Sequence, residues 1–87
     1  MSSEQQNGIR AVVKGFIARA SNVEELDDDV DLFETGIVNS LFAVQLMTFL
    51  EKTFAIEVGL DDLDIENFKS VNATTAFVVQ KTMRAGG

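Results

Sequence analysis

Ser40 is the side chain whose place in the sequence is best suited to chemistry. It follows a long loop and a turn glycine, Gly36, and stands at the predicted start of a helix. The first turn of a helix exposes unpaired backbone N–H groups and the positive end of the helix dipole, so a phosphate esterified to Ser40 would be stabilised there. Serine is also an ordinary residue at helix starts, and position alone favours that simpler interpretation.

The acidic residues offer two other kinds of site, and both are poorly supported. Asp27, Asp29 and Asp31 have the first, third and fifth positions of a calcium-binding EF-hand loop. The sixth position of that loop should be Gly and is Leu32, and the twelfth should be Glu and is Val38. Paired carboxylates for acid–base catalysis would need a pocket, for which so short a chain has little room. We therefore expect no metal site.

The absence of two residue types from the chain excludes several further kinds of site. The 87-residue chain contains no Cys and no His, which excludes disulfides, zinc–thiolate sites, a Cys nucleophile and a Ser–His pair. A chain of this length supports one domain, which we expect to extend over residues 1–87 and to be ordered over about 5–84. We expect a protein that is not an enzyme and has no catalytic residue.

The charge balance restricts the partners. The chain has 14 acidic and 7 basic residues and a formal net charge of −7. Nucleic acids and anionic membrane surfaces are therefore not expected as partners, whereas a basic protein surface is. The N-terminus is polar, and no apolar run reaches the roughly 20 residues of a membrane span. We predict a cytoplasmic monomer.

The spacing of apolar residues predicts a first helix from Gln5 to Ala20, followed by a long connection from Ser21 to Asn39. The connection contains half of the acidic residues of the chain, but also several apolar residues that we expect to fix it to the core. The apolar positions of the first helix repeat as one helical stripe: Ile9, Val12, Val13, Phe16, Ile17 and Ala20.

A second helix is predicted from Ser40 to Phe54, with Asn39 as its N-cap. Phe42 and Phe49 share a side about a quarter-turn from its inward stripe. The helix therefore has more apolar surface than one core contact requires. The inward stripe comprises Ala43, Leu46, Met47, Leu50 and Phe54.

The last third of the chain predicts one short and one longer helix. Short helical turns are expected within Asp61–Phe68, capped by Asp61 or Asp64. A final helix is expected to reach about Arg84, with Asn72 as N-cap and Val71 packing onto Ala76 as a hydrophobic staple. The predicted fold is all-α: an antiparallel four-helix bundle with three longer helices, one short helix and a long loop between helices one and two.

The run from Asp31 to Leu46 resembles the modification region of acyl and peptidyl carrier proteins. That family has a Leu-Phe-x-x-Gly loop, which ends here at Gly36, and an Asp-Ser-Leu motif that opens the second helix. The motif stands here as Asn39, Ser40 and Leu41. Asn39 can still cap the helix, but it lacks the charge of the family's Asp, which removes a carboxylate available for recognition by a transferase.

The resemblance implies that Ser40 carries a covalent 4'-phosphopantetheine group, with Asn39 and Leu41 beside the attachment point. A separate phosphopantetheinyl transferase would take the group from coenzyme A, using magnesium. The arm ends in a thiol that holds an acyl or aminoacyl group as a thioester. The other implied partners are an acyl-loading enzyme and a synthase or acyltransferase. A chain without Cys thus acquires its reactive sulfur from the cofactor.

Carriers of fatty acid synthesis have acidic residues along the outer face of the second helix, and this chain has apolar and neutral residues there. We predict a partner surface that docks through apolar contact with few salt bridges. The alternative is that the two Phe residues extend the core. The predicted partner surface comprises Phe42, Val44, Gln45, Thr48 and Phe49.

The cargo is open to more than one interpretation. The segments 39–46 and 62–68 resemble stand-alone carriers of specialised polyketide and antibiotic pathways, which hold small polar units such as glyceryl or substituted malonyl groups. D-alanyl carrier proteins, which share the Leu-Phe-Glu loop and the Val-Gln-Leu stretch of the helix, are the nearest alternative. A non-covalent helical interaction module is an alternative of another class.

Overall fold

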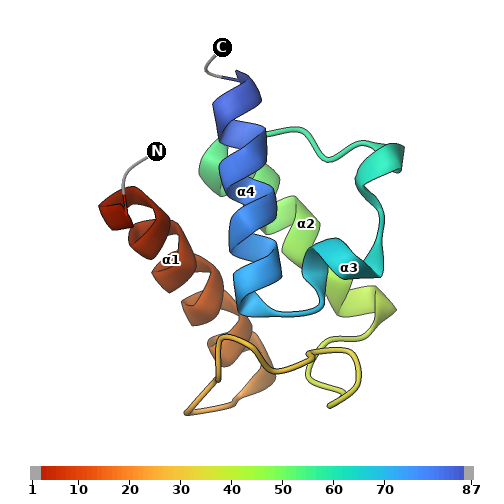
Figure 1. Cartoon of the computed structure of the whole chain (residues 1–87). Coiled ribbons are helices and arrows are strands. Elements are labelled where there is room, and N and C mark those ends of the chain that lie inside the picture. Colours follow the sequence, from red (N-terminus) through yellow and green to blue (C-terminus); the bar gives the residue numbers. More distant parts are fainter. Residues whose placement is uncertain (1–2, 86–87) are drawn as a thin grey trace.

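The computed structural model describes residues 3–85, with side chains through Met83, and every regular element in this range is helical (Figure 1). This confirms the predicted all-α architecture with its long loop between the first two helices. Residues 1, 2, 86 and 87 of the predicted domain lie outside the described range. The elements are α1 (Ser3–Ser21), α2 (Ser40–Phe54), the 3-10 turn η1 (Leu60–Asp62), α3 (Ile65–Phe68) and α4 (Val71–Ala85).

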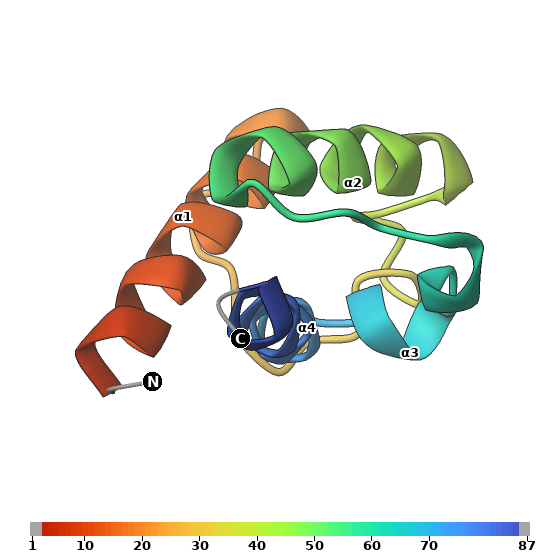
Figure 2. The same cartoon turned by 90° about the horizontal axis from the view of Figure 1, so that it is seen from above.

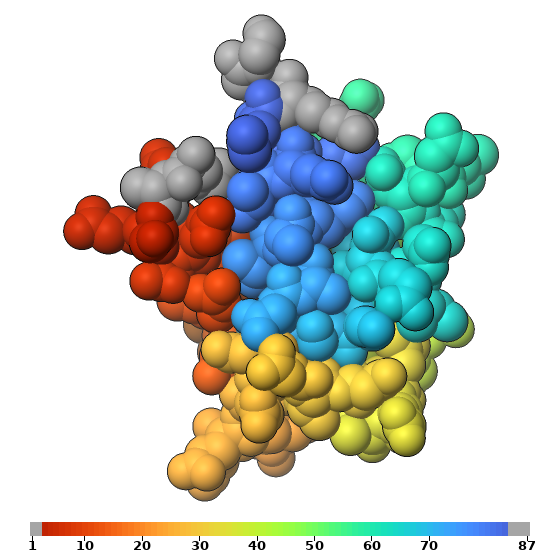
Figure 3. Space-filling model, viewed as in Figure 1, coloured from red at the N-terminus to blue at the C-terminus, as the bar shows by residue number. Residues whose placement is uncertain are grey.

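Three longer helices surround the core, and α3 packs beside α4 (Figures 1 and 2). Helix α1 runs opposite to α4, and α2 crosses behind α4 obliquely. The loop 22–39 closes one end of the bundle, where its surface is orange and yellow in Figure 3. Two backbone hydrogen bonds fix it there: Leu32 N–H donates to the Lys69 carbonyl (2.6 Å), and Asn72 N–H donates to the Asp28 carbonyl (3.0 Å).

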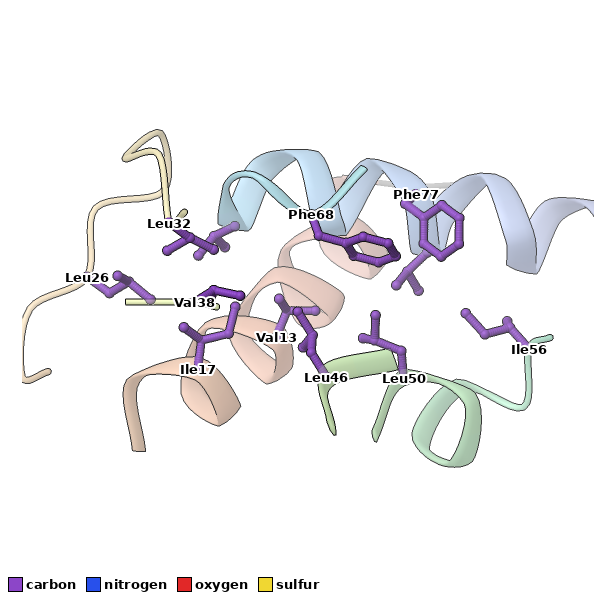
Figure 4. Close-up of a cluster of buried hydrophobic side chains, with 12 residues drawn as sticks. Val13, Ile17, Leu26, Leu32, Val38, Leu46, Leu50, Ile56, Phe68 and Phe77 are labelled. Atoms are coloured by element: carbon purple, nitrogen blue, oxygen red, sulfur yellow. The ribbon is translucent and has the colours of Figure 1, made fainter. Parts of the chain in front are cut away.

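The core draws side chains from every helix longer than one turn, from α3 and from both long connections (Figure 4). The predicted attachment of the first loop is confirmed, because Leu26, Leu32 and Val38 are buried. Burying each such side chain contributes about 1.5–3 kcal/mol, so a loop rich in acids is kept in place. The buried apolar residues are Val13, Ile17, Leu26, Leu32, Val38, Leu46, Leu50, Ile56, Phe68, Val71, Phe77 and Val78.

Helix α1 buries a narrower stripe than predicted. Val13 and Ile17 are fully buried, but Val12 and Ala20 are exposed. The helix lies at the edge of the bundle, so only its innermost positions are covered on all sides (Figure 2). It also starts two residues earlier than predicted and ends one later, at Ser21. Asn22 follows with a left-handed φ of 59°, which is the usual termination by a polar residue.

The predicted start of the last helix is wrong. Helix α4 begins at Val71, and the Ser70 hydroxyl accepts a hydrogen bond from Ala73 N–H (2.9 Å), as an N-cap does. Asn72 lies within the first turn instead, where its side-chain oxygen accepts from Arg10 Nε of α1 (3.0 Å). The staple is also wrong, since Val71 is buried within the helix and Ala76 is exposed.

None of the helices described combines the length and the apolar composition that crossing a bilayer demands.

Candidate functional site

Ser40 is the first residue of α2 and is exposed. Asn39 precedes it in extended backbone geometry (φ −119°, ψ −178°), and its side-chain oxygen accepts a hydrogen bond from Phe42 N–H (2.9 Å). The predicted N-cap is therefore confirmed. The Asn39 carbonyl accepts from Ala43 N–H (2.9 Å). Capping leaves Ser40 at the surface end of the helix, with its side chain in reach of another protein.

The loop that leads to Ser40 is internally bonded. One oxygen of Asp31 accepts from the N–H groups of Phe33 (3.0 Å) and Glu34 (2.9 Å). Gly36 has the predicted positive φ, 80°, and Val38 N–H donates to the Leu32 carbonyl (2.9 Å). These bonds set the direction in which the chain enters α2, so they fix the position of Ser40.

Acidic residues of this loop accept hydrogen bonds that stabilise its turns. Asp27 accepts from Asp29 N–H (3.1 Å), in the same way that Asp31 caps its own turn. Asp28 forms an ion pair with Lys14 of α1 (3.1 Å). Within residues 3–85 no three carboxylates come together as a metal site would require.

A groove of about 220 Å³ lies beside Ser40, between α2 and α3. Phe33 of the loop also lines it. Its surface is mostly apolar, and Asp64 is the charged residue in it. The remaining lining residues are Ala43, Met47, Leu63, Ile65 and Phe68.

The far wall of this groove was missed by reasoning from the sequence. Leu63 and Ile65 flank Asp64, which caps α3 by accepting a hydrogen bond from Glu66 N–H (3.0 Å). Asp64 is one of the two predicted caps, and it is the one that caps α3 in the structure. The signal that was available is two apolar residues spaced i, i+2 in an otherwise acidic segment, but the segment is too short for periodicity to indicate where they point.

A larger hollow, of about 460 Å³, lies over α1, α3 and α4. Ser40 does not line it, and two of its polar residues, Arg10 and Asn72, are hydrogen-bonded to each other. We therefore regard the smaller groove as the one connected with Ser40.

The residues of the predicted partner surface differ in their exposure. Phe42 and Phe49 are half-buried, and both rings contact Phe16 of α1, with centroid distances of 5.8 and 4.1 Å. These two residues therefore fill the contact between α1 and α2. Gln45 and Thr48 are exposed, and their role in a partner surface stays a prediction.

The exposed surface around Ser40 is apolar and uncharged. Leu41 is 71% exposed and Val44 is 55% exposed. Helix α2 has no charged residue from Ser40 to Leu50. One carboxylate, that of the exposed Asp64, lines the groove next to this surface, and Asp61 of η1 and Glu66 of α3 are also exposed. The nearby Lys69 is paired with Glu66 (2.9 Å), and that hydrogen bond and charge raise the pKa of Lys69.

The geometry fits a phosphate-linked group on Ser40. The side chain is exposed, the helix dipole favours an anion at this end, and the N–H groups of Ser40 and Leu41 have no acceptor within residues 3–85. An apolar groove starts at the same residue and can take part of a flexible arm. An exposed serine at a helix start beside such a groove fits a small helical carrier of a covalent prosthetic group.

The chain belongs to the family described as the phosphopantetheine attachment site, whose model matches residues 7–78. This confirms the resemblance to acyl carrier proteins. The cofactor of this family is covalently attached 4'-phosphopantetheine.

Three similar proteins are D-alanyl carrier proteins. The one from Lactococcus lactis subsp. cremoris (strain MG1363) is 39% identical over 56 residues, which are 64% of this chain and 71% of that protein. The one from Lactococcus lactis subsp. lactis (strain IL1403) is 38% identical over 68 residues, or 76% of this chain and 86% of that protein. The one from Lacticaseibacillus casei (strain BL23) is 29% identical over 75 residues, or 80% and 93%.

Proposed function

We propose that this protein carries an aminoacyl group, D-alanyl in the first instance, on a phosphopantetheine arm attached to Ser40. The observation that carries the attachment site is the exposure of Ser40 at the capped start of α2, beside an apolar groove. The arm supplies a thiol that holds the cargo as a thioester. The predicted setting remains the cytoplasm, where the protein is expected to act as a monomer.

The residues around Ser40 have separable roles in this proposal. Asn39 fixes the first turn of α2 and so the direction of the Ser40 side chain. The free N–H groups of Ser40 and Leu41 face an anion at the helix start. The chain has no His, so we infer that the base that removes the Ser40 proton belongs to the phosphopantetheinyl transferase.

The similarity to D-alanyl carrier proteins supports an aminoacyl cargo better than a polyketide unit. The electrostatics agree with it. An aminoacyl group has a positive ammonium, which is favoured near a chain of net charge −7 and beside Asp64 in the groove. A malonyl-type unit has a carboxylate of its own, which the same charges repel. This favours D-alanine over hydroxymalonyl or methoxymalonyl groups.

We propose that the partner enzymes dock on the apolar surface next to Ser40, formed by Leu41, Val44, Leu63 and Ile65. Large apolar side chains exposed together around a reactive residue are typical of interaction sites. The neighbouring carboxylate of Asp64 fits a basic residue at the rim of the partner. The partners we expect are the transferase, an enzyme that loads the amino acid, and an acyltransferase that receives it.

Intact-mass measurement after incubation with coenzyme A, Mg²⁺ and a broad-specificity transferase tests the attachment. We expect the wild type to gain the mass of one phosphopantetheinyl group. Ser40→Ala should gain nothing, whereas the control Ser21→Ala should gain as much as the wild type. An unmodified wild type would support the non-covalent interaction module instead, and modification of Ser40→Ala would place the arm elsewhere.

The cargo is tested on the modified protein with two loading enzymes. We expect an ATP-dependent D-alanine ligase to add one alanyl group, and a malonyl-type acyltransferase to load the carrier much more slowly. Efficient malonyl loading without alanyl loading would restore the polyketide interpretation.

A further inference from the structure

The far wall of the Ser40 groove has little apolar anchorage. Leu63 and Ile65 line the groove but are 51% and 61% exposed. No side chain between Ile56 and Phe68 is buried, although these two residues themselves are in the core. Segments without buried apolar contacts open at the lowest cost in a folded protein. Polar contacts must therefore hold this wall in place.

Asp62 is the centre of these polar contacts. Its carboxylate accepts a hydrogen bond from Gly59 N–H (2.9 Å), which closes the turn of η1. Its carbonyl accepts from the side-chain amide of Asn67 (2.9 Å) and from Asp64 N–H (2.9 Å). Asp62 thus connects η1, the wall residues 63–65 and α3. A shift of Asp62 would therefore also move the wall of the groove.

Lys81 connects Asp62 to α4. The Lys81 Nζ atom lies 2.5 Å from Asp62 Oδ2, and both side chains are only 19% exposed. The Coulomb attraction within an ion pair largely removed from water is stronger than within one on the surface. The same ammonium lies 5.8 Å from the centroid of Phe77, whose ring meets Phe68 edge-on at 5.1 Å. Phe68 itself lines the groove. Lys81 is therefore linked to the groove in two ways, through Asp62 and through the rings of Phe77 and Phe68.

We propose that Lys81 is a positioning residue, and that its ion pair with Asp62 holds the wall 63–65 beside α2 and so sets the width of the groove at Ser40. The effect on the arm and on partner docking rests on the proposed function, whereas the placement of the wall does not. Loss of the ion pair opens the groove, while Ser40 stays in place because it belongs to α2.

Amide hydrogen exchange on the unmodified protein tests the placement of the wall. Lys81→Met removes the charge and keeps the aliphatic stem above Phe77. We expect protection of the Gly59 and Leu63 amides to fall by about tenfold or more, which corresponds to ~1.4 kcal/mol. Protection of core amides on α1 should change by less than about twofold. Lys81→Arg, which keeps the charge, should restore most of the lost protection.

Lys69→Met is the matched control, because it removes an ion pair of α3 that is exposed. We expect it to change the wall amides by less than about twofold. The proposal is overturned if Lys81→Met leaves the wall amides as protected as in the wild type. It is also overturned if protection falls equally on α1, since Lys81 would then stabilise the whole fold and not the wall.

Steady-state kinetics of the transferase test the link with the arm. We expect Lys81→Met to raise the KM for the carrier about fivefold, because Leu63 and Ile65 lose their fixed place, and to leave kcat within about twofold. An unchanged KM would overturn the link. If the wild type is not modified at all, the proposed function fails, and the exchange experiment alone decides on the ion pair.

Discussion

At the scale of single residues, the roles around Ser40 depend on local geometry. The side chain of Asn39 bonds three residues ahead, and Ser40 follows it directly. Such contacts within one turn are predictable from the sequence, because capping depends on residue type and on neighbours along the chain. The neutral Asn39 performs this structural role without the charge that the carrier family has there, so recognition by the transferase must use other groups.

The contacts of Phe42 and Phe49 could not be predicted from the sequence. Helical spacing placed them on one side of α2, but not against a particular partner. Their partner, Phe16, is 26 residues before Phe42 and belongs to another helix. A contact of this kind depends on how two helices cross, and no local pattern encodes the crossing. The structure therefore assigns both rings to packing, whereas the sequence allowed either packing or docking.

Phe42→Asp and Val44→Asp separate packing from docking on the same face of α2. Phe42→Asp should lower the free energy of unfolding by about 1–3 kcal/mol, because it places a carboxylate against Phe16. Val44→Asp should change it by less than about 0.5 kcal/mol, because Val44 is exposed, yet should raise the KM of the transferase. Urea denaturation and transferase kinetics measure the two effects. An equal loss of stability in both variants would contradict this division.

At the scale of elements, the apolar spacing was sufficient for the longer helices, whereas their ends depended on tertiary contacts. Ser70 and Asn72 are both good capping residues, and α4 uses Ser70. Asn72 is engaged by Arg10 of α1, a residue that is distant in sequence. The far wall of the groove was unpredictable for a related reason, since a polar contact with α4 holds it in place.

Two identical substitutions at different glycines test how the elements are built. Gly36 has φ 80°, and a side chain there meets no atom within 4 Å, so Gly36→Ala costs only backbone strain, about 1–2 kcal/mol. Gly15 lies within α1 in equally open space. Gly15→Ala should therefore stabilise the protein by about 0.5–1 kcal/mol. Thermal or urea denaturation gives both values, and the same sign for both would be the contrary result.

At the scale of the whole molecule, charge is distributed unevenly. The excess of acids is largely concentrated in the loop 22–39, while the face of α2 around Ser40 is neutral. Ion pairs at Asp28, Asp62 and Glu66 offset part of the repulsion. The two more exposed pairs, at Asp28 and Glu66, contribute only about 0–1 kcal/mol each, so the ion pairs do not balance a net charge of −7. The protein tolerates the repulsion because the apolar residues of the loop are in the core.

Salt should consequently stabilise this protein. At about 0.1 M ionic strength charges are screened beyond ~10 Å, which weakens repulsion across the loop more than it weakens the ion pair at Lys81, which is largely removed from water. We expect the Tm to rise by a few degrees when sodium chloride replaces a low-salt buffer. The double variant Glu24→Gln, Glu25→Gln should melt higher than the wild type in low salt and gain less from added salt, because both residues are exposed in the acidic loop. Calorimetry of both proteins at two salt concentrations measures this, and a Tm that falls with salt would show that the ion pairs outweigh the repulsion.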